Sequence, residues 1–465
     1  MKLRITDYHY KEIRRITSIS FFDGLDFPSE TGCILLLGQN NHQSRPALLV
    51  ADVLQPREED IQEQYEDGLV FSSAYLRRAL FQVRERNLAG FLTVHTHPFS
   101  DKRVTFSSYD DANDPSLMSN LNELQPGGVF GSIVLGKRSA AGRIWRPEVS
   151  DFYYLDELVI IGESLQSMNL NGRTSAFLPK AAAIFDRGLV ITGNGALSQL
   201  SQMRVGVIGA SGTGSLLAEL LVRAGVGDVL LFDFDTIEDV NLNRILHSRK
   251  RDAEAGTNKS LRLAEAINSL ELPTQIIPVP NGDIRKKAVA LELRGCDLLF
   301  GCIDRDWPRL ILCELSYQYL IPLIDLGTEI GISDESIQSI DSRVSYVAPG
   351  RPCLHCSGIV SDERVRLEAL SDEERERVIE MGYCENINLT MPAVMDLNMR
   401  AASYGALIAR HLLQPFLDIP LPTHIKEALT NYSTRAVHIE PKSECIICGN
   451  ARIGIGDCGW LTTIT

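Results

Sequence analysis

The stretch that most constrains the fold is "MRVGVIGASGTGSLLAELLVRAGVGDVLLFDFD" at 203–235. An apolar run of strand length meets a glycine-rich turn, the turn opens an amphipathic helical pattern, and a second apolar run ends on Asp233. Gly209, Gly212 and Gly214 let the backbone approach phosphates, whose charge the N–H groups at a helix start stabilise. Asp233 follows Gly209 by 24 residues, about where a carboxylate receives a ribose hydroxyl. The stretch predicts a nucleotide-binding β-α-β unit, with a tight turn that holds no ligand as the alternative.

Length and charge limit the classes of protein to consider. A chain of 465 residues exceeds the size at which single cores usually divide, so two or three domains are expected. The balance of 44% apolar and 23% charged residues is typical of globular proteins. The formal net charge of −14 argues against nucleic acid as a partner, because phosphate backbones are bound by clustered Lys and Arg. We therefore expect a protein or small-molecule partner.

The hydropathy pattern and the cysteines indicate the compartment. No run approaches the roughly 18 apolar residues of a membrane span, and the first fifteen residues, "MKLRITDYHYKEIRR", lack the apolar region of a signal peptide. We expect a cytoplasmic protein that does not bind a membrane. In that reducing compartment, paired spacing among the ten cysteines indicates metal binding or catalysis more often than disulfides.

The elements fall into two groups along the chain, and both predict an α/β fold. Residues 1–165 alternate short strand and helix patterns, and a polar stretch, "SMNLNGRTSA", follows them. The predicted organisation is an N-terminal domain at 1–165, a linker at 166–180 and a C-terminal domain at 181–465.

The residues after Asp233 are more specific than the glycines. "DFDTIEDVNLNRILHSRKRDAEAGTNKS" (233–260) and "CDLLFGCIDRDWPR" (296–309) follow in order. With the glycine turn they resemble the ThiF/MoeB-like adenylyltransferases, the family that includes ubiquitin-activating enzymes, which implies a Rossmann-like, doubly wound domain that uses ATP and Mg²⁺. The resemblance implies these roles: Asp233 for the ribose; Asn241, Arg244 and Lys259 for the phosphates; Asp304 for Mg²⁺; and Arg309 as a supporting charge.

The chemistry of adenylation gives the same residues a reason to be there. Joining an adenylyl group to a carboxylate brings two anions together, so cations and a metal must surround the α-phosphate. Arg244, Lys259 and Asp304 meet that need, although each cation alone would also fit a solvated surface. Upstream, Arg187 occupies the region where relatives carry an arginine that reaches a neighbouring subunit's ATP, which implies a homodimer. Ser211 stands where the family usually has glycine, so we expect an ordinary or mildly strained φ there.

Two CxxC pairs, in "RPCLHC" and "SECIICG", predict a closed tetrahedral site for a structural Zn²⁺. The ligands would be Cys353, Cys356, Cys445 and Cys448. The alternative is four unrelated buried thiols. Because the pairs lie nearly 90 residues apart, the metal would hold the C-terminal region against the sheet domain, as in many relatives.

Cys384 has a different setting, in "EMGYCENINLTMPAVMDLNMRAAS" at 380–403. The segment follows a charged helical pattern and precedes one that resembles the family's "PAV…N…AS" helix. In activating enzymes a loop thiolate takes over the adenylated C-terminus as a thioester. Cys384 is our candidate for that nucleophile, and a packed or incidental thiol is the alternative.

The third motif is "GFLTVHTHPFSDKRVTFSSYDDAND" at 90–114. His95 and His97 alternate at the end of a strand pattern, so both side chains point the same way and can share a metal. Downstream, Ser107 precedes Asp110 by three residues, and upstream Glu30 stands just ahead of an apolar run.

A Glu, then HxHP, then SxxD resembles the JAMM/MPN metallo-isopeptidases over roughly residues 15–150. The resemblance implies a cytidine-deaminase-like α/β/α domain in which His95, His97 and Asp110, or Asp111 in its place, ligate a catalytic Zn²⁺. It also implies Glu30 as general base and Ser107 as an oxyanion donor. Three protein ligands leave a position open for water, whose pKa the metal lowers toward 7.

Together the two halves resemble fused peptidase and activating proteins of bacterial ubiquitin-like conjugation operons, some linked to antiphage defence. The resemblance implies a zinc isopeptidase that cleaves after a ubiquitin-like C-terminus and an ATP-dependent enzyme that adenylates that C-terminus. The partner would be a protein ending in glycine, with a conjugating enzyme as a further partner. The alternatives are maturation and adenylation of a sulfur carrier for cofactor biosynthesis, and a catalytically inactive scaffold.

Overall fold

A computed structural model describes residues 1–17, 29–65, 68–170, 182–333, 336–381, 392–442 and 444–463. The chain divides into two compact units. The first unit is Met1–Ala176 together with Gln318–Leu320 and Asn450–Trp460, and the second is Phe177–Tyr317, Ile321–Gly449 and Leu461–Thr465.

The first unit is built on a mixed sheet with the strand order β11-β10-β1-β3-β2-β6-β7-β8-β9. The strands are β1 (Lys2–Thr6), β2 (Gly32–Asn40), β3 (Ala47–Leu54), β6 (Gly90–Thr96), β7 (Val129–Leu135), β8 (Ala140–Arg146), β9 (Asp151–Tyr154), β10 (Glu157–Ile161) and β11 (Leu165–Asn169). A separate small sheet pairs β4 (Ile61–Gln64) with β5 (Leu69–Phe71). The helical elements are α1 (Asp7–Thr17), η1 (Glu58–Asp60), α2 (Ser73–Glu85), α3 (Ser108–Leu124) and η4 (Asn450–Arg452).

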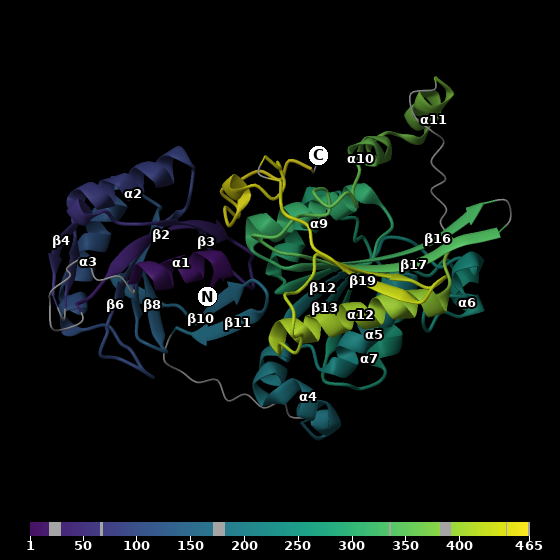
Figure 1. Cartoon of the computed structure of the whole chain (residues 1–465), viewed down its shortest axis with the longest axis horizontal. Helices are drawn as coiled ribbons and strands as arrows, with labels where there is room; N and C mark the ends of the chain where they lie inside the picture. The colour runs from purple at the N-terminus through teal and green to yellow at the C-terminus, as the bar shows by residue number, and fades with distance from the viewer. Residues whose placement is uncertain are drawn as a thin grey trace. The chain divides into compact units, whose positions relative to one another are not determined.

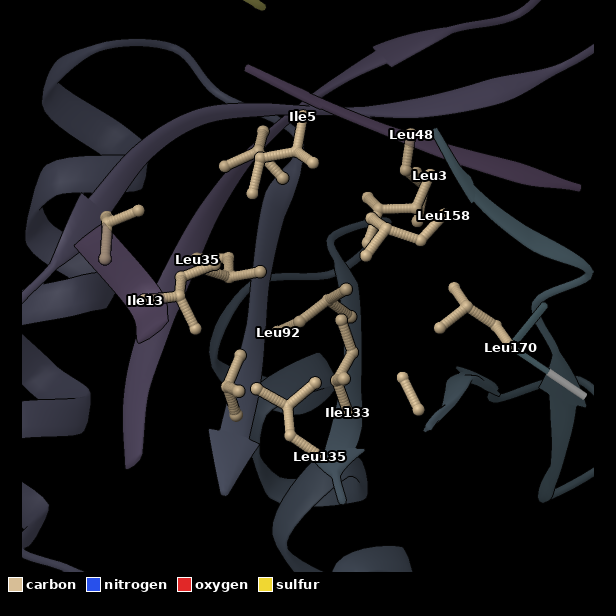
Figure 2. Close-up of a cluster of buried hydrophobic side chains, with 14 of the residues drawn as sticks. Leu3, Ile5, Ile13, Leu35, Leu48, Leu92, Ile133, Leu135, Leu158 and Leu170 are labelled. Carbon is tan, nitrogen blue, oxygen red and sulfur yellow. The ribbon is translucent and has the colours of Figure 1, made fainter. Parts of the chain in front are cut away.

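The central strand β2 shows why helices cover both faces of this sheet. Successive side chains of a strand point to opposite faces, and the apolar run of β2 supplies both. Leu35 packs with Ile13 of α1 in one buried cluster, shown in Figure 2. Leu36 packs with Ala79 of α2 and Leu121 of α3 in another. The unit is therefore a three-layer α/β/α arrangement, as predicted for the N-terminal part of the chain.

The second unit contains the predicted β-α-β unit in a sheet of order β14-β13-β12-β15-β16-β17-β18-β19. The strands are β12 (Arg204–Ile208), β13 (Asp228–Phe232), β14 (Gln275–Val279), β15 (Leu298–Gly301), β16 (Leu323–Ser333), β17 (Ser336–Val347), β18 (His424–Ala428) and β19 (Ser433–Val437). The helical elements are α4 (Ala182–Leu200), α5 (Gly212–Ala224), η2 (Asp239–Asn241), α6 (Lys250–Glu254), α7 (Lys259–Asn268), α8 (Lys287–Glu292), η3 (Leu293–Gly295), α9 (Asp306–Tyr319), α10 (Asp362–Ala369), α11 (Asp372–Glu380) and α12 (Met395–Leu413).

The order of the parallel strands fixes where a ligand can bind. In sheet order, the strands β14, β13, β12, β15 and β16 are parallel to one another. The pairs β16–β17, β17–β18 and β18–β19 are antiparallel. The chain runs from β12 outward through β13 to β14, then returns to β15 on the other side of β12. Helices α5, α7 and α12 cover one face of the sheet, and α9 lies on the other (Figure 1). Open α/β sheets bind ligands at such a reversal point, outside the carboxyl ends of the two strands. The predicted doubly wound, Rossmann-like sheet is confirmed.

Among the described residues, no helix combines the length and the apolar character that crossing a membrane demands.

Candidate functional sites

The glycine turn lies at the reversal point, between the ends of β12 and β15. Gly209 has φ of 99°, and a Cβ there would lie 2.5 Å from the carbonyl oxygen of Cys302, the residue after β15. A Cβ on Gly214 would lie 1.7 Å from the carbonyl oxygen of Gly209. Ser211 has an ordinary φ of −90°, so its side chain fits without backbone strain. The turn thus packs the start of α5 against two strand ends.

Asp233, directly after β13, links the second strand to this turn. One carboxylate oxygen accepts a hydrogen bond from the Ala210 N–H at 2.7 Å, and the other accepts one from the Asp235 N–H at 2.9 Å. Burial, only partly offset by these donors, raises the pKa of Asp233 above its usual value. The carboxylate therefore lies against the glycine turn, in the position expected of a ribose acceptor.

Two of the predicted phosphate contacts lie near this turn. Lys259 begins α7 and is only 8% exposed, and its Nζ lies 3.0 Å from Asp235. That burial rules out a solvated surface lysine. Arg244 is half-buried, and its Cδ lies 3.5 Å from the position of a Cβ on Gly212. Asn241 is buried, but its side-chain oxygen accepts from the Glu238 N–H at 3.1 Å, so its observed contact shapes the loop.

Asp304 and Arg309, the two candidates in the segment after β15, differ in their exposure to solvent. Asp304 is exposed, two residues after the Cys302 carbonyl that faces Gly209. Arg309 is buried, and its Nε donates to Asp325 at 3.3 Å, so its charge is balanced inside the protein. That placement leaves Asp304 as the carboxylate of this segment that is open to solvent.

The structure describes only one of the two remaining sequence candidates of this unit. Arg187 is exposed on α4. Cys384 lies outside the described residues, so its role as a nucleophile stays a prediction.

The four CxxC cysteines form one cluster. Their sulfur atoms all lie within 4.8 Å of one another. Across the pairs, Sγ of Cys353 is 3.7 Å from Sγ of Cys445, and Sγ of Cys356 is 3.5 Å from Sγ of Cys448. Tetrahedral Zn²⁺ with Zn–S bonds of about 2.3 Å holds its sulfurs about 3.8 Å apart. The four thiols therefore fit a structural zinc ion, and the alternative of four unrelated thiols is wrong.

In the first unit, strand pairing brings Glu30 to the histidines. Gly32 of β2 pairs with His95 of β6 in an antiparallel ladder, so the residues just before β2 lie beside those just after β6. The buried Glu30 carboxylate lies 3.4 Å from Nε2 of His97. Donor atoms of Glu30, His95 and His97 all lie within 4.8 Å of one another.

Asp110 completes this group from the first turn of α3. Its two oxygens lie 3.2 Å from Nε2 of His95 and 3.5 Å from Nε2 of His97. Ligands of a tetrahedral zinc with bonds of about 2.0–2.1 Å are about 3.3 Å apart. His95 Nε2 is buried and makes no hydrogen bond of good geometry among the described residues, which suits a metal-directed nitrogen. The residues present fit a zinc ion with three protein ligands.

Electrostatics couples Asp110 to the two histidines. Burial disfavours its charge, but the nearby imidazoles of His95 and His97 outweigh burial and hold the pKa of Asp110 well below its usual range. Burial likewise lowers the pKa of His95, but the Asp110 carboxylate outweighs it and leaves that pKa raised. Asp110 is therefore ionised at neutral pH, as a metal ligand must be.

Ser107 caps α3 and holds Asp110. Its hydroxyl donates to an Asp110 oxygen at 2.8 Å, its own N–H donates to the same oxygen at 2.7 Å, and the Asp110 N–H donates back to its Oγ at 3.2 Å. This capping box fixes the ligand carboxylate at the helix start. The observed contact is thus with Asp110, and the oxyanion role of Ser107 stays a prediction.

Arg143 on β8 is a residue of this site that the sequence analysis missed. Its guanidinium is buried and reaches Asp111 at 2.6 Å and Asp114 at 2.8 Å, both on α3. It is also stacked between two phenylalanine rings, with Cζ 3.8 Å from the centroid of Phe106 and 4.2 Å from that of Phe152. Asp111 is therefore occupied by Arg143, and Asp110 is the carboxylate that faces the histidines. An arginine inside the strand-like run "AAGRIWR" was the available signal, because a charge on a buried strand needs partners.

Comparisons with known proteins bear on the second unit. The chain is 28% identical over 170 residues to ubiquitin-like modifier-activating enzyme 5 of Dictyostelium discoideum, covering 34% of this chain and 42% of that protein. It is 26% identical over 172 residues to the Caenorhabditis briggsae protein of the same name, covering 34% and 37%. The aligned part thus spans less than half the length of these relatives.

Among solved structures, E. coli MccB with ATP aligns with a TM-score of 0.45 and 15% identity over 59% of this chain and 76% of that chain. The model of the ThiF family matches residues 185–445, more than half of the 465 residues, and contains the glycine turn, Asp233 and Lys259. The chain therefore belongs to the ThiF family.

Proposed function

We propose that the second unit uses ATP to adenylate the C-terminal carboxylate of a small protein. The observation that carries the proposal is the grouping of Asp233, Lys259 and Arg244 about the glycine turn in a ThiF-family chain. The relatives named as ubiquitin-like modifier-activating enzymes support a ubiquitin-like protein as the substrate.

In this reaction a carboxylate oxygen of the substrate attacks the α-phosphorus of ATP. The bond to the β-phosphate oxygen breaks, pyrophosphate leaves, and an acyl adenylate remains. Asp233 would accept from the ribose, while Lys259 and Arg244 would offset the phosphate charge. Asp304 would hold Mg²⁺, which supplies further positive charge to the phosphates.

Pyrophosphate exchange tests this proposal. Wild-type protein with Mg²⁺, ATP and a panel of small proteins ending in glycine should return labelled pyrophosphate to ATP for the true substrate. Asp304→Ala should abolish that exchange, whereas Asp362→Ala, in an exposed carboxylate of α10, should not. Unchanged exchange in Asp304→Ala would show that the metal is held elsewhere.

We further propose that the first unit is a zinc isopeptidase that cleaves after the same ubiquitin-like C-terminus. The support is the convergence of four side chains: His97 Nε2 lies 3.4 Å from Glu30 and 3.5 Å from Asp110, and His95 Nε2 lies 3.2 Å from Asp110. A bound Zn²⁺ would acidify a water molecule. Glu30 would take the proton from that water as the water oxygen bonds to the carbonyl carbon of the amide, and would pass the proton to the nitrogen of the leaving amine as the carbon–nitrogen bond breaks.

Metal content separates this proposal from that of an inactive scaffold. We expect two zinc equivalents per chain in wild-type protein and one in His95→Ala, with the remaining ion in the cysteine cluster. One equivalent in wild-type protein would favour the scaffold. Cleavage of a C-terminally extended substrate should also stop in Glu30→Ala.

The remaining features of the proposal follow from the ThiF resemblance and from the resemblance to fused peptidase and activating proteins of bacterial conjugation operons. They are a homodimer in which Arg187 reaches the partner's nucleotide, thioester formation on Cys384, a conjugating enzyme downstream and a part in antiviral defence. A Cys384→Ala variant should still exchange pyrophosphate but form no reducible adduct with the substrate. A sulfur carrier is the second candidate substrate, and formation of a thiocarboxylate would distinguish it.

A further inference from the structure

Asn398 on α12 reaches the glycine turn from a distant part of the sequence. Helix α12 packs along α5 and against β16 and β17. Asn398 is only 3% exposed. Its Nδ2 lies 2.2 Å from the position that a Cβ on Gly212 would occupy, so the amide rests directly on the first residue of α5. That contact explains why position 212 requires a glycine.

Two threonines fix the orientation of the Asn398 amide. Its Oδ1 accepts hydrogen bonds from Oγ1 of Thr213 at 3.3 Å and from Oγ1 of Thr328 at 3.2 Å. Because both threonines donate to the oxygen, the amide nitrogen points away from them. Within the described part of the chain Nδ2 donates to no group, which leaves its N–H donors for a ligand.

The surroundings indicate which ligand would accept from this nitrogen. The first N–H groups of an α-helix lack partners within the helix, and α5 begins at Gly212. The Cδ of Arg244 approaches the same point, 3.5 Å from the Gly212 Cβ position. A buried neutral donor beside a helix N-terminus favours an anionic oxygen, and the stem of a positively charged arginine lies close by.

We propose that Asn398 is a nucleotide-binding residue whose Nδ2 donates to a phosphate oxygen of ATP and of the adenylate formed from it. The inference rests on the proposed ATP-dependent function of this unit. It adds a contact from α12, the helix that follows the segment of Cys384, to those of the glycine turn. The role is ligand binding rather than packing alone, because packing on Gly212 needs no donor.

Two substitutions that keep the branching and the number of heavy atoms of the side chain separate binding from packing. Asn398→Asp keeps an oxygen that accepts from both threonines but replaces the donor with a negative charge. Asn398→Leu removes both functions without adding charge. If the nitrogen contacts a phosphate, Asp should weaken ATP binding more than Leu, because two anions then face each other. If Asn398 only packs, Asp should perform as well as Leu or better.

Isothermal titration calorimetry with ATP, AMP and adenosine on the full-length protein provides the test. We expect Asn398→Asp to bind ATP and AMP at least about tenfold more weakly than wild type, Asn398→Leu to lose less, and adenosine binding to stay within about twofold. ATP affinity within about twofold of wild type in Asn398→Asp, or a parallel loss of adenosine, would overturn the inference.

Further measurements distinguish a folding defect from a failure of the proposed function and from a failure of this inference. If Asn398→Asp does not fold, as judged by circular dichroism, Asn398→Ser replaces it, with an expected ATP loss of about threefold or more and unchanged adenosine binding. Equal ATP affinity of the serine variant and wild type would then refute the contact. If wild-type protein binds no ATP, the proposed function fails together with this inference. If wild type binds ATP and the variants match it, only the inference fails.

Discussion

The guanidinium of Arg143 lies 2.6 Å from the carboxylate of Asp111, the residue next to Asp110, which faces His95 and His97. Neighbouring residues on a helix point in different directions. The ion pair that holds Asp111 toward Arg143 therefore also fixes the direction in which Asp110 points. Since Arg143 also binds Asp114, its charge is held from two successive turns. Removing one partner of a buried charge pair leaves the other charge without compensation.

Replacing Arg143 should therefore weaken zinc binding in the first unit without removing a ligand. We expect Arg143→Met to lose zinc to a chelator at least about tenfold faster than wild type, since residues that orient metal ligands typically contribute that much to affinity. The measurement is zinc release to a colorimetric chelator. Arg138→Met is the matched control, because Arg138 pairs with Asp101 at the exposed surface. Equal release rates in the two variants would contradict a positioning role.

Loss of one cysteine ligand should destabilise the second unit. We expect Cys356→Ser to retain one zinc fewer than wild type and to unfold at a lower temperature, because structural zinc contributes directly to folding free energy. Metal analysis and differential scanning calorimetry would check both effects. Cys458→Ser, outside the cluster, should keep the wild-type zinc content. Full zinc in Cys356→Ser would show that the cluster does not hold the ion.

The carboxylate of Asp233 should be needed for the nucleoside more than for the fold. Asp233→Asn keeps an oxygen that can accept from the Ala210 N–H but loses the charge and one acceptor. We expect about a tenfold weaker affinity for adenosine and for ATP alike, measured by calorimetry. Asp228→Asn, where the carboxylate pairs with Arg204 at the other end of the strand, is the control. The Asn398 variants should behave differently, because they should weaken the affinity for ATP without weakening the affinity for adenosine.

His424 should make stability fall in mild acid. Burial, aided by Arg343, lowers the pKa of His424 from 6.5 to about 4. The unfolded chain takes up this proton below pH 6.5 and the folded chain only near pH 4, so the contribution to stability is full above that window and is lost as pH falls through it. At pH 5 the loss amounts to about 2 kcal/mol.

Urea unfolding at pH 7 and pH 5 measures this effect. His424→Asn should lose about 2 kcal/mol less than wild type between the two pH values, whatever its stability at pH 7. His438→Asn, in an exposed histidine, should follow the wild-type dependence. Parallel pH curves for His424→Asn and wild type would show that another group carries the acid sensitivity.

The amino-acid sequence alone was enough to predict the features that depend on the spacing of residues along the chain. The glycine turn, the two strands that flank it and Asp233 were predicted because backbone geometry and apolar periodicity act over a few residues. Two CxxC pairs predicted one cluster even across nearly 90 residues, because a closed zinc site needs four ligands. The pattern of Glu30, the histidines and Asp110 was found in the same way, through a resemblance that fixes residue types and order.

Tertiary structure alone decided which partners these residues have. The pairing of β2 with β6 brings Glu30 to His97, and the buried Arg143 selects Asp110 over Asp111. Asn398 reaches Gly212 only because α12 packs along α5, 185 residues from Thr213 in sequence. Such contacts depend on the packing of elements that are far apart in the chain. Spacing within the sequence carries no record of which helix or strand will cover another, since that choice minimises the free energy of the whole core.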